Sequence, residues 1–126
     1  MRREAIMGSG AASVGPYSHG VVANGFVYLS GQTPIDSATG RLVEGGIDAQ
    51  VRQCFRNLVA ALEAAGLSLA NVIKCNVFLT DMGDFTAMNA VYAEHFLEPY
   101  PARTTIGVLS LPLGARVEIE MVAVAS

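Results

Sequence analysis

The stretch IDAQVRQCFRNLVAALEAAGLSLANVIKCNVFLT, residues 47–80, decides the fold because it predicts a helix followed by a strand. Apolar side chains recur at steps of three and four residues, which predicts a helix from about residue 48 to residue 65. Gly66 follows as a suitable C-terminal cap. Residues 72–80 then predict a strand. One face of this strand carries Ile73, Cys75, Val77 and Leu79.

The segment before this stretch predicts a hairpin. Two β-rich runs flank the dipeptide Asn24-Gly25, which suits the positive φ angles of a two-residue turn. Residues 21–30 therefore predict two paired strands. Residues 31–46 are rich in Gly, Pro, Asp and Ser, and this composition predicts irregular, turn-rich chain.

The segment after this stretch predicts a second helix and two further strands. Asp81 can cap a helix over about residues 82–96, and two prolines end it. Residues 104–109 predict a short strand, and residues 116–125 predict a longer, regularly alternating one. The apolar stripe of the second helix consists of Phe85, Met88, Tyr92 and Phe96.

This order of elements predicts a single α+β domain over residues 1–126, with two helices packed on one face of a mixed sheet. Residues 1–14 are expected to be loosely ordered. The other face of the sheet is also partly apolar, and 52% of the chain is hydrophobic. We therefore expect other subunits to cover that face, although an Ala- and Val-rich core with some exposed apolar surface is the plainer explanation.

The charge of the chain argues against nucleic-acid binding. The net charge is −3, and the eight basic residues are spread along the chain, whereas non-specific binding of nucleic acid requires a dense positive surface.

Cys54 and Cys75 are too few for a disulfide-stabilised secreted domain and are expected to be reduced thiols. We find no signal peptide and no apolar run of about 20 residues. The chain is expected to be a soluble, cytoplasmic protein.

The standard motifs for phosphate, dinucleotide and serine-nucleophile sites are absent from the sequence. No metal site is expected either, because the histidines and cysteines show no metal-ligand spacing and are better explained by packing or surface positions. These residues are His19, Cys54, Cys75 and His95.

The last predicted strand carries Glu118 and Glu120 on one face, beside valines. A carboxylate with apolar neighbours is costly to ionise, so its pKa rises and it can exchange protons with water near neutrality. Two ordinary glutamates on a solvated strand end explain the same pattern equally well.

Arg103 opens the strand over residues 104–109, directly after a Pro-Ala pair. Its planar guanidinium matches a carboxylate in bidentate geometry, which makes it a candidate for binding an acidic metabolite. A salt bridge to Glu118, Glu120 or Glu98 is the alternative.

Five short motifs are far more specific together than any of them is alone. They are Gly15-Pro16-Tyr17-Ser18-His19, Tyr28-Leu29-Ser30-Gly31-Gln32, Asn89-Ala90-Val91-Tyr92, Pro101-Ala102-Arg103-Thr104-Thr105 and Val117-Glu118-Ile119-Glu120. In this order they closely resemble the reactive-intermediate deaminase (Rid) family, also called YjgF. The resemblance runs from about Gly15 to Ala125.

The resemblance implies a chorismate-mutase-like fold and a homotrimer with an active site in each cleft between subunits. It implies hydrolysis of short 2-imino acids, or of enamine tautomers such as 2-aminoacrylate, to 2-keto acids and ammonia. Such imines (2-iminopropanoate and 2-iminobutanoate among them) are released by pyridoxal-phosphate-dependent dehydratases. The family requires no cofactor. Two alternatives stay open, a non-catalytic trimer that binds 2-keto acids and an endoribonuclease, the latter disfavoured by the acidic charge balance.

The resemblance also assigns roles to individual residues. Arg103 matches the arginine that binds the substrate carboxylate, and Glu118 matches the acid that handles the attacking water. Many members carry cysteine where this chain has Thr105, so a thiolate role at that position is in doubt. The remaining pocket positions are matched by Tyr17, Ser30, Gly31 and Asn89.

Overall fold

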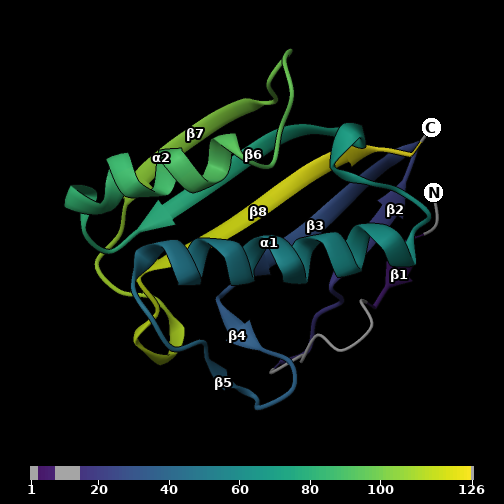
Figure 1. Ribbon diagram of the computed structural model, residues 1–126. Coiled ribbons are helices and arrows are strands. Elements are labelled where there is room, and N and C mark those ends of the chain that lie inside the picture. The colour runs from purple at the N-terminus through teal and green to yellow at the C-terminus, as the bar shows by residue number, and fades with distance from the viewer. Residues whose placement is uncertain (1–2, 8–14, 126) are drawn as a thin grey trace.

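The computed structural model describes residues 3–7 and 15–125, in which two helices cover one face of a six-stranded sheet and a small two-stranded sheet lies beside it (Figure 1). The six strands lie in the order β1-β2-β3-β8-β6-β7. Only β6 and β7 are parallel, and all other neighbours are antiparallel. The strands are β1 (Glu4–Ile6), β2 (Gly20–Ala23), β3 (Phe26–Gln32), β6 (Val72–Leu79), β7 (Ala102–Gly107) and β8 (Val117–Val124). The predicted α+β class and the mixed sheet are confirmed.

The predicted hairpin at Asn24-Gly25 is present as β2 and β3. Both turn residues have positive φ angles, 52° and 79°, as the two-residue turn requires. The prediction of irregular chain over residues 31–46 was wrong in part. β3 extends to Gln32, and β4 (Ile35–Asp36) pairs with β5 (Arg41–Leu42) in a small separate hairpin. The turn residues that suggested a loop form the bend of this hairpin.

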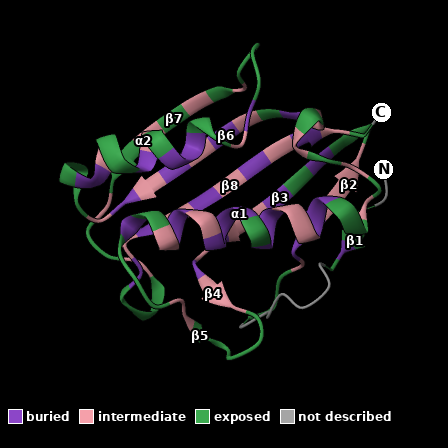
Figure 2. Cartoon of the chain, in the orientation of Figure 1, coloured by how far each residue is buried: buried purple, intermediate pink, exposed green. Residues whose placement is uncertain are grey.

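The first helix, α1 (Ile47–Ala64), confirms the predicted helix and lies across β3 and β8 (Figure 1). Its sheet-facing side is buried (Figure 2). Gly66 follows the helix with φ +74°, and its N–H donates to the Glu63 carbonyl at 2.9 Å. The sequence placed Gln50 and Gln53 away from the apolar face, yet both are buried, because their amides have hydrogen-bonding partners in the fold.

The second helix is shorter than predicted. A 3₁₀ turn, η2 (Met82–Asp84), precedes α2 (Phe85–Ala93), and the chain leaves the helix before Phe96. The Asp81 side chain accepts a hydrogen bond from the Gly83 N–H at 2.8 Å, as its capping role predicts. The strand that follows, β7, starts two residues earlier than expected, at Ala102.

A bulge in β6 changes which of its side chains face the core, so the predicted face was wrong at Ile73. The register of β6 against β8 shifts between Val72 and Lys74. Val72 therefore points to the core, and Ile73, expected there, is 43% exposed. Cys75, Val77 and Leu79 are buried as predicted. Two further 3₁₀ turns, η1 (Leu69–Asn71) and η3 (Pro112–Gly114), precede β6 and β8.

Both helices lie on the same face of the sheet, so no helix within residues 3–7 and 15–125 covers the opposite face, here called the bare face (Figure 1). Apolar side chains remain on that bare face, among them Phe26 at 37% and Tyr28 at 50% exposure, with Ile106 at 46%. Of the predicted loose segment 1–14, Glu4–Ile6 pair with β2, and residues 1–2 and 8–14 lie outside the described residues.

Candidate active site

A cavity of about 580 Å³ lies on the bare face of the sheet and collects four of the predicted site residues. Tyr17, Ser30, Gly31 and Glu118 all line it. They come from the chain before β2, from β3 and from β8, which the sheet places side by side. The remaining lining residues are Thr33, Ile35, Pro112, Leu113 and Glu120.

An irregularity in β3 shapes this cavity. The register of β3 against β8 shifts between Leu29 and Gln32, which is typical of a bulge next to a site. The Ser30 hydroxyl donates to the Ser18 carbonyl at 2.6 Å and so fixes the bulge to the preceding chain. A Cβ on Gly31 would overlap the Glu118 carboxylate, whose Cδ lies 3.0 Å from that position. Glycine is therefore required for Glu118 to lie where it does.

Helix α1 fixes part of the lining of this cavity. The buried Asn57 amide donates to the Thr33 carbonyl at 3.2 Å and to the Ile35 carbonyl at 3.0 Å. These two bonds tie the chain between β3 and β4 to the helix. The cavity is consequently built on fixed backbone, which holds its polar groups in a constant geometry.

Glu118 has the environment of a proton-transfer group. Burial raises its pKa above the ordinary 4.5, and the negative charge of Glu120 raises it further. Glu120 itself accepts a hydrogen bond from the Asn76 amide at 2.9 Å. Among the described residues no hydrogen-bond donor contacts the Glu118 carboxylate, so its oxygens are available to a water or a ligand. A raised pKa and free oxygens are what a proton-transfer group requires, and that role stays a prediction.

Gly31→Ala is expected to lower activity by about 100-fold while leaving the fold intact, because the new methyl group displaces the Glu118 carboxylate. Steady-state kinetics and thermal unfolding of the purified variant measure both effects. Gly46→Ala is the matched control, since its added Cβ meets only Asp48 Oδ1 at 3.8 Å. Unchanged activity in Gly31→Ala would contradict a catalytic position for Glu118.

A second cavity, of about 450 Å³, lies between α2 and β7 and contains Arg103 and Asn89. The guanidinium carbon of Arg103 lies 4.7 Å from the centre of the Tyr92 ring and 5.6 Å from that of Phe85. Both aromatic residues lie on α2. Such contacts hold the cation by the ring faces without using its N–H donors.

The alternative interpretation, a salt bridge between Arg103 and a glutamate, is not supported. The ion pairs within residues 3–7 and 15–125 join Arg52 to Glu94 and Arg116 to Asp84, both at 2.7 Å. No carboxylate of the described residues therefore occupies the planar guanidinium of Arg103, a group whose geometry suits a carboxylate.

A single chain does not bring Arg103 and Glu118 together. Arg103 pairs in register with the buried Cys75 and faces the helices, whereas Glu118 pairs with Phe78 and faces the bare side of the sheet. The two predicted catalytic residues thus lie on opposite faces. Thr105 lines neither cavity, and its hydroxyl is buried without a hydrogen-bond partner in the described part of the chain.

Sequence reasoning missed two groups of residues. Phe85 and Tyr92 were assigned only to the apolar stripe of the second helix, although they also hold the Arg103 side chain. Their spacing of seven residues would have placed both rings on one helix face. Pro112 and Leu113, which line the Glu118 cavity, gave no signal, since a turn between strands does not reveal which cavity it borders.

The sequence matches the protein family described as Endoribonuclease L-PSP over residues 7–125. It is 50% identical over 110 residues to a RutC family protein of Pyrococcus horikoshii, covering 87% of each chain. It is 42% identical over 124 residues to the 2-iminobutanoate/2-iminopropanoate deaminase of Capra hircus, covering 98% of this chain and 90% of that protein. The crystal structure of RidA from the Antarctic bacterium Psychrobacter sp. is similar with a TM-score of 0.92 and 46% identity, covering 97% of this chain and 99% of that one. The chain belongs to the Rid (endoribonuclease L-PSP, YjgF) family. The family resemblance of the five motifs is therefore confirmed.

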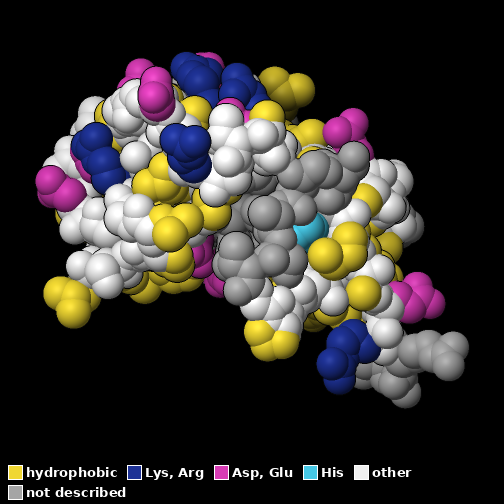
Figure 3. Space-filling view, turned by 90° about the horizontal axis from the view of Figure 1, so that it is seen from below, with side chains coloured by type: hydrophobic (Ala, Val, Ile, Leu, Met, Phe, Trp, Pro, Cys, Tyr) yellow, Lys and Arg dark blue, Asp and Glu magenta, His cyan; other side chains and the backbone are white. Residues whose placement is uncertain are grey.

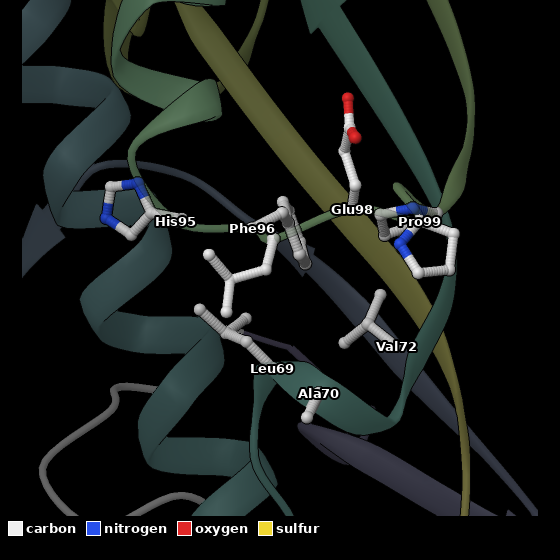
Figure 4. Close-up of a pocket in the computed structure, with 9 residues that line it drawn as sticks. Leu69, Ala70, Val72, His95, Phe96, Glu98 and Pro99 are labelled. Carbon is white, nitrogen blue, oxygen red and sulfur yellow. The ribbon is translucent and has the colours of Figure 1, made fainter.

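A further cavity of about 380 Å³ in this Rid-family chain shares Pro101 with the Arg103 cavity but includes none of the predicted site residues (Figure 4). It lies between η1 and the turn that follows α2, and Leu69, Phe96 and Pro99 contribute to its walls. His95 borders it, but its ring stacks on Phe55 with centroids 3.9 Å apart. That histidine therefore packs against the core as well as bordering a cavity.

The described residues of the Rid-family chain contain no group of three His, Cys, Asp or Glu side chains that could hold a metal ion. Cys54 and Cys75 are buried and free, and burial raises the pKa of both thiols. Both thiols therefore stay protonated, which disfavours either as a nucleophile.

Two further observations bear on nucleic-acid binding and on membrane insertion. On the face shown in Figure 3, basic side chains are scattered among acidic and apolar ones, which does not match the continuous basic groove of a nucleic-acid site. Neither helix within residues 3–7 and 15–125 combines the length and the hydropathy that crossing a bilayer needs.

Proposed function

We propose that this Rid-family protein hydrolyses short 2-imino acids and their enamine tautomers to 2-keto acids and ammonia. The observation that carries the proposal is the Arg103 guanidinium, which is held by aromatic rings and has no carboxylate partner among the described residues. An arginine kept free in this way suits the carboxylate of a small acid. The deaminase of Capra hircus, to which this chain is similar, is named for this class of substrate. The proposed substrates are 2-aminoacrylate, 2-iminopropanoate and 2-iminobutanoate.

The proposed active site is shared between two copies of the chain in a homotrimer. Arg103 and Glu118 face opposite sides of the sheet, so one chain alone cannot present both to a small substrate. The bare face also carries exposed Phe26 and Tyr28, and such apolar surface is typical of a subunit interface. Packing the bare face of one copy against the β7 edge of the next would cover these rings and join the two groups of site residues.

The mechanism requires only positioning and proton transfer. Arg103 binds the substrate carboxylate through two N–H donors and so orients the C=N bond toward Glu118. The Glu118 carboxylate accepts a proton from water while the hydroxyl adds to the carbon of the protonated imine, which gives the neutral carbinolamine. Glu118 then donates this proton to the amino nitrogen, the C–N bond breaks, and the hydroxyl proton passes back to Glu118 as the C=O bond of the 2-keto acid forms. Ammonia takes up that proton and leaves as ammonium, which restores the carboxylate. No step in this scheme calls on a cofactor or a metal.

Mixing two inactive variants tests the shared site. Arg103→Ala and Glu118→Gln damage different groups of residues, so a mixed assembly recreates some intact sites when each site takes one residue from each copy. With equal co-expression and random assembly, we expect about a quarter of the wild-type activity. The co-purified mixture is assayed beside each variant alone. Activity no higher than that of the single variants would show that the site lies within one chain.

A trapping assay tests the reaction itself. A pyridoxal-phosphate-dependent threonine dehydratase releases 2-iminobutanoate, and semicarbazide traps the free imine. Added protein is expected to reduce the trapped imine and to speed formation of 2-oxobutanoate. If trapping does not change but 2-oxobutanoate binds, the non-catalytic regulatory trimer is the better function. RNA cleavage that is abolished by Arg103→Ala would instead favour the endoribonuclease.

The cytoplasm remains the proposed location. Cys54 and Cys75 are both free and buried, which suits a reducing compartment. The proposed partners are a small imino or keto acid and two further copies of this chain.

A further inference from the structure

The turn before β8 holds a residue in an unusual conformation. Leu113, inside η3, has φ 59° and ψ 19°, in the left-handed region that is unfavourable for a bulky side chain. Its side chain is 65% exposed, so burial within the chain does not compensate for the strain. Strained residues of this kind tend to cluster at functional sites.

The chain around Leu113 is fixed rather than loose. The Ala115 N–H donates to the Pro112 carbonyl at 3.1 Å, and Ala115 is only 1% exposed. The next residue, Arg116, donates its N–H to Gln50 Oε1 at 2.9 Å and pairs with Asp84 through two hydrogen bonds. The turn therefore presents Leu113 from a rigid base.

Leu113 is one of the apolar residues that line the Glu118 cavity. With Pro112 and Ile35 it supplies the apolar lining, whereas the polar lining comes from Ser30, Thr33 and the two glutamates. A small acid whose reacting carbon faces Glu118 thus has apolar side chains available for its own side chain. The lining thus combines polar groups that can orient a ligand with apolar side chains that can contact the rest of it.

We propose that Leu113 is a specificity-determining residue, which contacts the side chain of the substrate and makes kcat/KM rise with the length of a linear apolar side chain. This inference rests on the proposed function and adds the recognised part of the substrate to it. The preference follows from burial of apolar surface: each methylene removed from water raises kcat/KM by up to about fourfold. Removal of the Leu113 contact lowers this gain per methylene.

Leu113→Asn is the variant that isolates this contact. Asparagine is similar in size to leucine, is polar, and adopts the left-handed conformation more readily than leucine does, so the turn is retained. Leu109→Asn is the matched control, because Leu109 belongs to the same inter-strand segment, is 100% exposed and does not line the Glu118 cavity. Melting temperatures of both variants are expected to be no lower than that of the wild type.

The test is a series of linear substrates. An L-amino-acid oxidase makes imines from alanine, 2-aminobutyrate, norvaline and norleucine, and kcat/KM for each is measured by semicarbazide competition. The wild type and Leu109→Asn are expected to gain up to about fourfold per methylene, and Leu113→Asn less than about twofold. An equal gain per methylene in Leu113→Asn and the wild type would overturn the inference. So would a loss of both the assembly and the activity in Leu113→Asn, since Leu113 would then serve contacts between copies.

Binding separates this inference from the proposed function. Dissociation constants for pyruvate, 2-oxobutanoate, 2-oxopentanoate and 2-oxohexanoate are measured by titration calorimetry with the same three proteins. A wild type that hydrolyses no imine but binds longer keto acids more tightly, with this trend lost in Leu113→Asn, would refute the deaminase and retain the role of Leu113. Keto acid affinities independent of chain length in the wild type would overturn the role of Leu113.

Discussion

Arg103→Lys is expected to lower kcat/KM for 2-iminobutanoate by about 10- to 100-fold, since one charge-assisted hydrogen bond is worth about 1.5–3 kcal/mol. Lysine keeps the positive charge but offers a single ammonium in place of the planar fork. The substrate carboxylate is then held by one group and is less well oriented. Affinity for 2-oxobutanoate should weaken in parallel. Steady-state kinetics and calorimetry on the purified variant measure these two effects.

The fold should tolerate this change. Arg103 makes no ion pair with the described residues, and lysine can still lie over the Tyr92 ring. Arg41→Lys is the matched control, because Arg41 is exposed on β5 and borders neither group of site residues. Wild-type kinetics in Arg103→Lys would refute bidentate binding of the substrate, and equal losses in both variants would point to a non-specific effect of arginine replacement.

Glu118→Gln is expected to lower kcat by about 10²- to 10⁴-fold, the usual contribution of general acid–base catalysis. Glutamine has nearly the same shape, fits above Gly31 in the same way and cannot accept the proton of water. Affinity for 2-oxobutanoate should therefore stay within about twofold of the wild type. Full turnover in Glu118→Gln would mean that another base acts.

The pH dependence gives a second readout of Glu118. The proposed base is active when ionised, and its pKa is raised above 4.5 by burial and by Glu120. Turnover of the wild type should therefore fall, as the pH is lowered, at a higher pH than for an ordinary glutamate. Glu120→Gln is the matched control: it should remain active, and its acidic limb should shift to lower pH because one negative charge beside Glu118 is gone.

Glu118→Gln should lower catalytic activity without lowering thermal stability. A carboxyl group whose folded pKa is raised favours the folded state below its unfolded pKa, and this contribution is lost as the pH rises through the folded pKa. At neutral pH the ionised Glu118 is thus destabilising, so Glu118→Gln should melt no lower than the wild type. A variant that is inactive and at least as stable separates the chemistry from the fold.

Local sequence signals placed most of the elements, since helix and strand periodicity depends on neighbours along the chain. Asn24-Gly25 marked the β2–β3 turn, and the apolar steps marked α1 to within one residue at either end. The predictions were wrong where contacts between residues far apart in the sequence determine the structure. The bulge at Ile73 depends on the register of β6 against β8, and the burial of Gln50 depends on the Arg116 backbone 66 residues away.

For the candidate site, too, the sequence predicted some features and only the folded chain showed the others. The motif pattern alone picked out Arg103, Glu118 and Gly31, because each type of chemistry requires a particular side chain. Only the folded chain showed that Arg103 and Glu118 face opposite sides of the sheet, that aromatic rings hold Arg103, and that Leu113 borders the Glu118 cavity. These relations depend on strand order and register, which are set by packing across the whole sheet and leave no mark in the spacing of residues along the chain.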